Sequence, residues 1–183
     1  MNSLVQTPGR SPAGLNTTAD QRQYLTFMLG GEMFSIGILG IKEIIEYAGV
    51  TEVPMMPACI RGVINLRGAV VPVMDLSSRF GKPTTAVTKR TCIVIVEVTG
   101  DDQQSQVMGI VVDAVNAVLE IPASEIEPAP AFGAKIRTDF IEGMGKVDGK
   151  FVILLNVNRV LSVEEIGAMT QTATATSALS LPA

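Results

Sequence analysis

An internal duplication limits the folds open to this chain. Residues 60–75 and 141–156 share one pattern: an Ile-x-Gly start, a second glycine six residues after the first, an apolar run, and a final Asp or Asn. All matched positions are 81 residues apart. Each copy is typical of a strand, a tight glycine turn and a buried returning strand. We therefore expect two copies of a small β unit, which a chain of this length can hold as two ~70-residue barrels.

A weaker match precedes each copy. Residues 36–38 with Ile41 and Ile44 correspond to residues 110–112 with Val115 and Val118, at an offset of 74 residues. Because the offset rises from 74 residues at this match to 81 at the glycine hairpins, the two halves differ by a seven-residue insertion. The duplication is thus expected to extend beyond the glycine hairpins.

Short apolar segments bounded by Gly, Pro, Asp or Asn predict strands through most of the chain. Gly30-Gly31 and Asp148-Gly149 each separate two such segments and are typical of hairpin turns. Many short strands with little helix favour a mostly β fold built from barrels or a sandwich. The expected strands are residues 24–29, 33–36, 62–66, 70–74, 92–98, 107–112, 117–120, 143–147 and 151–157.

Three helical segments are expected. Ile38, Ile41 and Ile44 recur every third residue, which predicts a short amphipathic helix over residues 38–45 with Glu43 on its polar face. Asp75 can cap a single turn over residues 76–80. Ser162-x-x-Glu165 is a capping-box pattern ahead of a C-terminal helix.

The composition excludes several classes of function. The chain has no histidine, which removes Ser-His-Asp and Cys-His nucleophile systems and histidine-containing metal sites. Its two cysteines, Cys59 and Cys92, form no C-x-x-C motif and have apolar neighbours, so we expect two reduced thiols. No phosphate-binding glycine loop is present. We expect no nucleotide, no metal and no other cofactor.

Charge and hydropathy bear on the partners. Lys plus Arg is 14 and Asp plus Glu is 18, a net charge of −4 without a basic run, so binding to nucleic acid or to an anionic membrane is not expected. Residues 1–19 are polar and contain no apolar leader segment, and no apolar run reaches the ~18 residues that span a bilayer. We expect a cytoplasmic protein with no direct membrane insertion.

Residues 60–76 carry a specific family motif. They read Ile-Arg-Gly-Val-Ile-Asn-Leu-Arg-Gly-Ala-Val-Val-Pro-Val-Met-Asp-Leu, which resembles the I-x-G-x-x-N-L-R-G-x-x-x-P-V-x-D-L signature of the CheW family of bacterial chemotaxis coupling proteins. The similarity covers about residues 22–169 and includes residues 27–32, 107–113, 126–130 and 141–145.

The resemblance implies a fold and a function. It implies two intertwined, five-stranded SH3-like barrels with a hydrophobic cleft between them. It also implies a non-enzymatic adaptor that joins the cytoplasmic tips of methyl-accepting chemotaxis receptors to the regulatory domain of the histidine kinase CheA. A receiver domain has no room in this chain, and a CheA chain needs a phosphorylatable histidine, so a stand-alone coupler is expected.

The expected organisation has three parts. Residues 1–20 form a flexible arm, residues 21–169 form the domain of two barrels, and residues 170–183 form a flexible tail. The first barrel takes about residues 21–85 plus the C-terminal helix, and the second takes about residues 86–160.

Candidate interaction residues follow from the turns and from the resemblance. Arg67 precedes Gly68 at a turn, where its guanidinium can contact a partner carboxylate. Glu43 matches an acidic position that the family uses in receptor binding, and Ile41 lies either in the core or in the cleft. These three are the predicted receptor-binding residues. Phe132, in a proline-rich loop, and Gly143 are the predicted kinase-binding residues.

Other residues have structural interpretations. We expect Gly62, Gly68 and Gly149 to be turn glycines, and Asn65 to hydrogen-bond the turn backbone.

Two other functions stay open at this point. One is a β-barrel enzyme or ligand-binding protein that uses Asp75, Asp113 and Glu120, although capping and turn roles are expected for these carboxylates. The other is a coupler in a related array whose output is not swimming.

Overall fold

A computed structural model describes residues 21–100, 102–129 and 138–162. The expected N-terminal arm, the C-terminal tail, Phe132 and the C-terminal helix beyond Ser162 lie outside the described residues. None of the described helices is long and apolar enough to cross a membrane.

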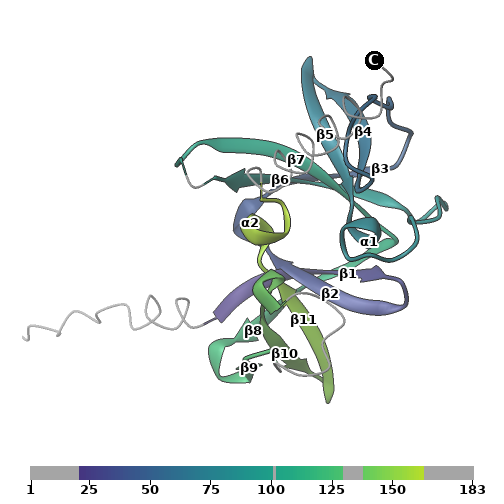
Figure 1. The fold of residues 1–183 in the computed structure, drawn as a ribbon. Coiled ribbons are helices and arrows are strands. Elements are labelled where there is room, and N and C mark those ends of the chain that lie inside the picture. Colours follow the sequence, from purple (N-terminus) through teal and green to yellow (C-terminus); the bar gives the residue numbers. More distant parts are fainter. Residues whose placement is uncertain (1–20, 101, 130–137, 163–183) are drawn as a thin grey trace, which may run out of the picture.

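The described residues form two sheets, which lie one above the other in Figure 1. The six-stranded sheet has the order β8-β1-β2-β11-β10-β9, with β9 only two residues long, and the five-stranded sheet has the order β3-β6-β7-β5-β4. The strands are β1 (Gln21–Leu29), β2 (Glu32–Gly37), β3 (Ile41–Glu46), β4 (Ile60–Leu66), β5 (Ala69–Asp75), β6 (Cys92–Thr99), β7 (Ser105–Val112), β8 (Ala114–Pro122), β9 (Ile126–Glu127), β10 (Ile141–Val147) and β11 (Lys150–Leu155).

Helices are few and short. They are α1 (Leu76–Arg79), α2 (Val157–Val160) and the 3₁₀ turns η1 (Ile38–Gly40), η2 (Ala123–Glu125) and η3 (Thr138–Phe140). The mostly β class and the two packed SH3-like units are confirmed. All nine predicted strands are present, and the sequence analysis missed β3 and β9.

The duplication is visible residue by residue. The β4–β5 and β10–β11 hairpins both shift register at the first glycine, between Ile60 and Gly62 and between Ile141 and Gly143. A residue at the end of β5 and one directly after β11 each cap a four-residue helix, because Asp75 accepts from the backbone N–H of Ser78 and Asn156 accepts from that of Arg159. The 81-residue offset therefore relates equivalent structural positions.

The 74-residue offset is also structural. The parallel pair Val73↔Gly109 between β5 and β7 corresponds to the parallel pair Leu154↔Ser35 between β11 and β2. The weaker sequence match thus aligns β2 with β7 in register.

The two repeats exchange strands. The six-stranded sheet combines β1 and β2 with strands that follow residue 113, whereas the five-stranded sheet contains β3 to β7. Sheet membership therefore differs from the expected division near residues 85 and 86, because the chain crosses between the sheets at η1 and again after β7.

The predicted helix over residues 38–45 is wrong. Only η1 is helical there, and Ile41–Glu46 forms the edge strand β3, which pairs with β6. Two of the spaced isoleucines lie in this strand, where β-branched side chains pack well against a neighbouring strand. The alternating half-buried and exposed residues of β3 show the period of a strand.

Three apolar clusters hold the fold together. Each sheet encloses a small cluster, one around Val73 and Ile95 and the other around Tyr24 and Leu154. The largest cluster joins the two sheets and includes Phe27, Phe34, Met74, Val96 and Val160. Because this third cluster draws on both sheets, they pack as one body.

Candidate interaction surface

Arg67 and Glu43 meet on the surface of the five-stranded sheet. The Arg67 guanidinium donates from Nη1 to Glu43 Oε1 at 2.8 Å and from Nη2 to Oε2 at 2.9 Å. The Arg67 side chain is 76% exposed and that of Glu43 is 25% exposed. Hydrogen bonding to Glu43, and then its charge, raise the pKa of Arg67 above its ordinary value. The two predicted receptor-binding residues therefore form one bidentate pair.

The position of the pair follows from the sheet order. Glu43 lies on β3, at one edge of the sheet, and Arg67 lies in the turn after β4, which is the other edge. A backbone bridge between Thr51 and Val63 joins the chain segment after β3 to β4. The ion pair and this bridge thus both connect the region of β3 to the opposite edge, as barrel closure requires.

The turn that presents Arg67 is tight. Arg67 has φ +51° and Gly68 has φ +86°, so both residues occupy the left-handed region. Asn65 Oδ1 accepts from the backbone N–H of Gly68 at 2.8 Å. The equivalent turn carries Asp148 at φ +51° and Gly149 at φ +76°. Asp is a favoured residue for this conformation and Arg is not, so Arg67 occupies a costly backbone position.

The other candidates differ in exposure. Ile41 is half-buried and packs against the cluster between the sheets, so it contributes to the core and borders the surface. Its neighbour on β3, Ile44, is 42% exposed and was not among the predicted site residues. In the sequence Ile44 directly follows Glu43, which could have indicated an apolar site residue. The helical interpretation of residues 38–45 instead assigned Ile44 to the buried face.

The bulge glycines have a packing role. A Cβ on Gly62 would lie 2.1 Å from the Thr51 carbonyl oxygen, and one on Gly143 would lie 3.0 Å from that of Glu127. Gly62 therefore belongs to a strand bulge and not to a turn. Gly143 is buried against β9, a placement that does not fit direct contact with a kinase.

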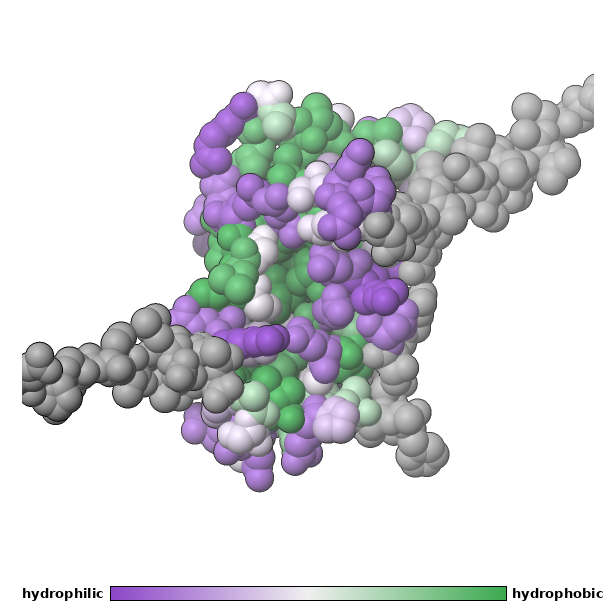
Figure 2. Space-filling model, turned by 90° about the vertical axis from the view of Figure 1, so that its left-hand side faces the viewer, coloured by the Kyte–Doolittle hydropathy of each residue, from purple (hydrophilic) through white to green (hydrophobic). Residues whose placement is uncertain are grey.

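Two apolar residues are exposed at equivalent positions of the duplication. Val70 on β5 is 73% exposed and Phe151 on β11 is 54% exposed. They follow the glycine turns of hairpins at opposite ends of the molecule in Figure 1. The 81-residue offset could have identified them, because both are apolar residues at the second position after a glycine turn. Figure 2 shows, on one face, apolar surface in patches between hydrophilic residues.

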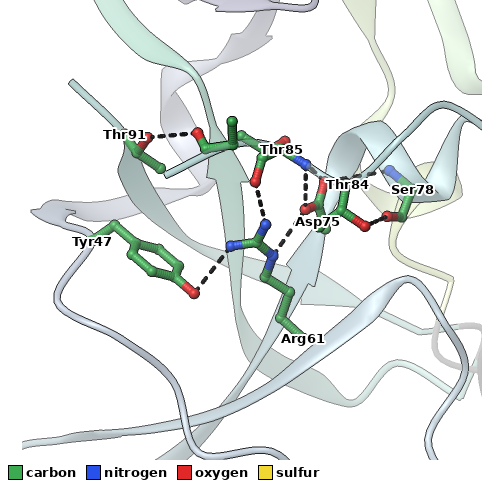
Figure 3. Close-up of polar contacts among 8 residues, drawn as sticks. Tyr47, Arg61, Asp75, Ser78, Thr84, Thr85 and Thr91 are labelled. Atoms are coloured by element: carbon green, nitrogen blue, oxygen red, sulfur yellow. Dashed lines mark hydrogen bonds and ion pairs between the residues drawn. The ribbon is translucent and has the colours of Figure 1, made fainter. Parts of the chain in front are cut away.

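A buried polar network around Arg61 and Asp75 was not predicted from the sequence (Figure 3). Arg61 Nε lies 2.9 Å from Asp75 Oδ2, and its Nη1 donates to the Tyr47 hydroxyl at 3.0 Å. Arg61 also donates to the Thr85 carbonyl, while the Thr85 N–H and hydroxyl donate to Asp75 at 2.9 and 3.0 Å. The network thus connects the segment between the repeats, through Thr85, to Asp75 at the start of α1.

The carboxylates considered for an enzyme have structural partners. Asp75 belongs to the Arg61 network, Asp113 accepts from the Gly30 N–H at 2.8 Å, and Glu120 accepts from Gln23 at 3.3 Å. Within the described part of the chain, no three Cys, Asp or Glu residues are grouped so that they could hold a metal ion.

Comparison with known proteins gives a consistent result. The model of the CheW-like domain family matches residues 23–165. The chain is 35% identical over 145 residues to the chemotaxis protein CheW of Klebsiella aerogenes, covering 79% of this chain and 84% of that protein. It is 32% identical over 153 residues to the chemotaxis protein CheW of Rhizobium meliloti, covering 84% of this chain and 96% of that protein.

A solved structure is also similar. The crystal structure of the scaffolding protein TtCheW from Thermoanaerobacter tengcongensis matches with a TM-score of 0.69 and 35% identity. The match covers 78% of this chain and 88% of that chain.

Proposed function

The chain belongs to the CheW family of chemotaxis scaffold proteins, and from this premise we propose that it couples methyl-accepting chemoreceptors to the histidine kinase CheA. Its role as a chemotaxis adaptor follows from the family. The particular partners, its cytoplasmic location and its recruitment to receptor arrays belong to the proposal. As a member of a scaffold family, it acts by holding other proteins and not by turning over a substrate.

The Arg67–Glu43 pair is the observation that carries the receptor part of the proposal. A bidentate guanidinium–carboxylate pair has a fixed geometry and leaves most of the Arg67 side chain exposed. The exposed Ile44 lies next to Glu43 on the same strand. An interface anchor of this kind combines an arginine with nearby apolar surface. We assign Arg67, Glu43 and the bordering Ile41 to receptor binding.

The kinase surface is assigned to the other end of the molecule. Phe132, which lies outside the described residues, remains a proposed apolar contact from the sequence alone. Gly143 contributes indirectly, because its lack of a side chain lets β9 pair closely with β10. The exposed Phe151, on the neighbouring strand β11, adds apolar area on this side. Two separate surfaces on two barrels suit an adaptor that holds two proteins at once.

Co-sedimentation tests this proposal. The full chain is mixed with vesicles that carry a chemoreceptor cytoplasmic fragment, with the CheA regulatory domain, or with both. We expect the chain to sediment with the receptor vesicles and to bring the CheA domain into the pellet. If the CheA domain stays in the supernatant at every concentration of the chain, the coupling function is wrong.

A further inference from the structure

The end of α1 is inserted among residues of the other half of the fold. α1 follows β5 and contacts β5 and β7 of the five-stranded sheet. Phe80, directly after α1, has its ring 5.8 Å from that of Phe34 on β2 and 6.1 Å from that of Phe140 in η3. Phe27 on β1 lies 6.2 Å from Phe34, so four rings form a row from β1 to η3. The row connects α1 to the six-stranded sheet.

Arg79, the last residue of α1, adds polar contacts to the same junction. Its Nε–H donates to the Val160 carbonyl of α2 at 2.9 Å. The centre of its guanidinium lies 4.6 Å from the centroid of the Phe140 ring. A charged hydrogen bond and a cation–π contact both depend on orientation, whereas apolar burial does not. Arg79 therefore restrains how α1 sits against α2 and η3.

The duplication makes this contact asymmetric. At the 81-residue offset, Arg79 corresponds to Val160 and Phe80 to Leu161, so Arg79 binds its own counterpart. Val160 and Leu161 are buried apolar residues of the cluster between the sheets. An apolar residue fills this place in one copy and a guanidinium fills it in the other. Arg79 is half-buried. Since a partly buried charge is a poor source of stability compared with an apolar side chain, its use here points to geometric specificity.

We propose that Arg79 is a positioning residue that fixes the relative orientation of the two barrels, so that the receptor surface and the kinase surface are presented together. This inference rests on the proposed function for its consequence in coupling. The orientation itself can be measured without any partner, and the two claims can therefore fail separately.

Three variants separate orientation from general stability. Arg79→Met keeps an apolar stem of similar reach but removes the guanidinium. Arg79→Lys keeps the charge and loses the planar group that donates along a fixed direction. Arg90→Met is the matched control, because Arg90 is an exposed arginine in the segment between the repeats.

The first measurement is the distance between spin labels on the two barrels. Labels are placed through Val70→Cys and Phe151→Cys, both exposed, in a background of Cys59→Ala and Cys92→Ser whose unfolding midpoint is checked first. We expect Arg79→Met to broaden the distance distribution, Arg79→Lys to give an intermediate width, and Arg90→Met to match the parent. A distribution of unchanged width in Arg79→Met would overturn the orientation role.

The second measurement compares separate and joint binding. For Arg79→Met we expect the affinities for the receptor fragment alone and for the CheA regulatory domain alone to stay within about twofold of wild type. The affinity for CheA in the presence of receptor should fall by about fivefold or more. The inference would be overturned if Arg79→Met lowered the affinity for the receptor fragment alone, the affinity for the CheA regulatory domain alone and the unfolding midpoint together. That result would show that Arg79 has only a structural role.

A third outcome concerns the proposed function. If the wild-type chain binds neither partner but Arg79→Met still broadens the distance distribution, the coupling function fails and the orientation role of Arg79 stands.

Discussion

The Arg67 guanidinium and the Glu43 carboxylate form two parallel hydrogen bonds, of 2.8 and 2.9 Å, between the β4–β5 turn and the edge strand β3. Sequence analysis expected each of these side chains to meet a partner protein, and in the structure they meet each other. A receptor that contacts either side chain must accommodate both. We therefore predict that the pair acts as one recognition unit and that its two members do not contribute independently to receptor binding.

Removal of either member should weaken receptor binding. We expect Arg67→Ala and Glu43→Ala each to cost more than about 1 kcal/mol of binding free energy, as truncation of an interface anchor does. The double variant should lose less than the sum, because each single change already disrupts the pair. Isothermal titration with the receptor fragment measures this. Arg22→Ala, which breaks the exposed 3.5 Å pair with Glu142 on the other sheet, should bind normally. Strictly additive losses would contradict the single unit.

The left-handed backbone at position 67 should separate binding from stability. Asn tolerates this conformation better than Ala or Arg, so Arg67→Asn should have a free energy of unfolding roughly 0.5–1 kcal/mol above that of Arg67→Ala. Both variants lose the guanidinium and should bind the receptor fragment equally weakly. Chemical denaturation and titration measure the two properties. Equal stabilities would show that the turn conformation at Arg67 is not costly.

The bulge in β4 should tolerate no side chain. A Cβ at position 62 would lie 2.1 Å from the Thr51 carbonyl oxygen, at a φ of +151°. We expect Gly62→Ala to lower the free energy of unfolding by more than about 2 kcal/mol, since backbone must move to relieve the contact. Gly37→Ala is the control, because a Cβ there meets nothing within 4 Å. Similar melting temperatures for the two variants would refute this explanation of Gly62.

The buried Arg61–Asp75 pair should contribute more to the free energy of unfolding than any exposed ion pair. The Asp75 side chain is fully buried and that of Arg61 is 13% exposed. Arg61→Met leaves the buried carboxylate without its cation, and we expect a loss of about 3–5 kcal/mol of unfolding free energy. Arg22→Met, at an exposed pair, should cost about 1 kcal/mol or less. Denaturant titration of both variants checks this, and a loss for Arg61→Met no larger than that for Arg22→Met would contradict it.

Most of the strands were predictable because a strand is indicated by the pattern of the few residues that form and bound it. Short apolar segments bounded by Gly, Pro, Asp or Asn marked nine of the eleven strands in the described residues. The repeated spacing around Gly62 and Gly143 also predicted that the two hairpins are equivalent. The spacing could not reveal that the repeats exchange strands, because the same local pattern pairs equally well with either copy.

The errors share a physical cause. The spacing of Ile38, Ile41 and Ile44 has the period of a helix, but the pairing of β3 with the buried strand β6 decides the local structure. Contacts between residues that are distant in the sequence could also not be predicted. No local pattern indicates that Arg67 binds Glu43, that Arg61 binds Asp75, or that Arg79 reaches Val160. The first two contacts form within the five-stranded sheet, whereas the contact of Arg79 with Val160 joins elements that follow the two equivalent hairpins.

The most direct test of the coupling function is CheA autophosphorylation in the presence of receptor-bearing vesicles, measured as the full chain is titrated in. We expect kinase activity to rise with the chain only when receptors are present, and Arg67→Ala to require a higher concentration for the same rise. Kinase activity that is independent of the chain in the presence of receptors would contradict the function proposed here.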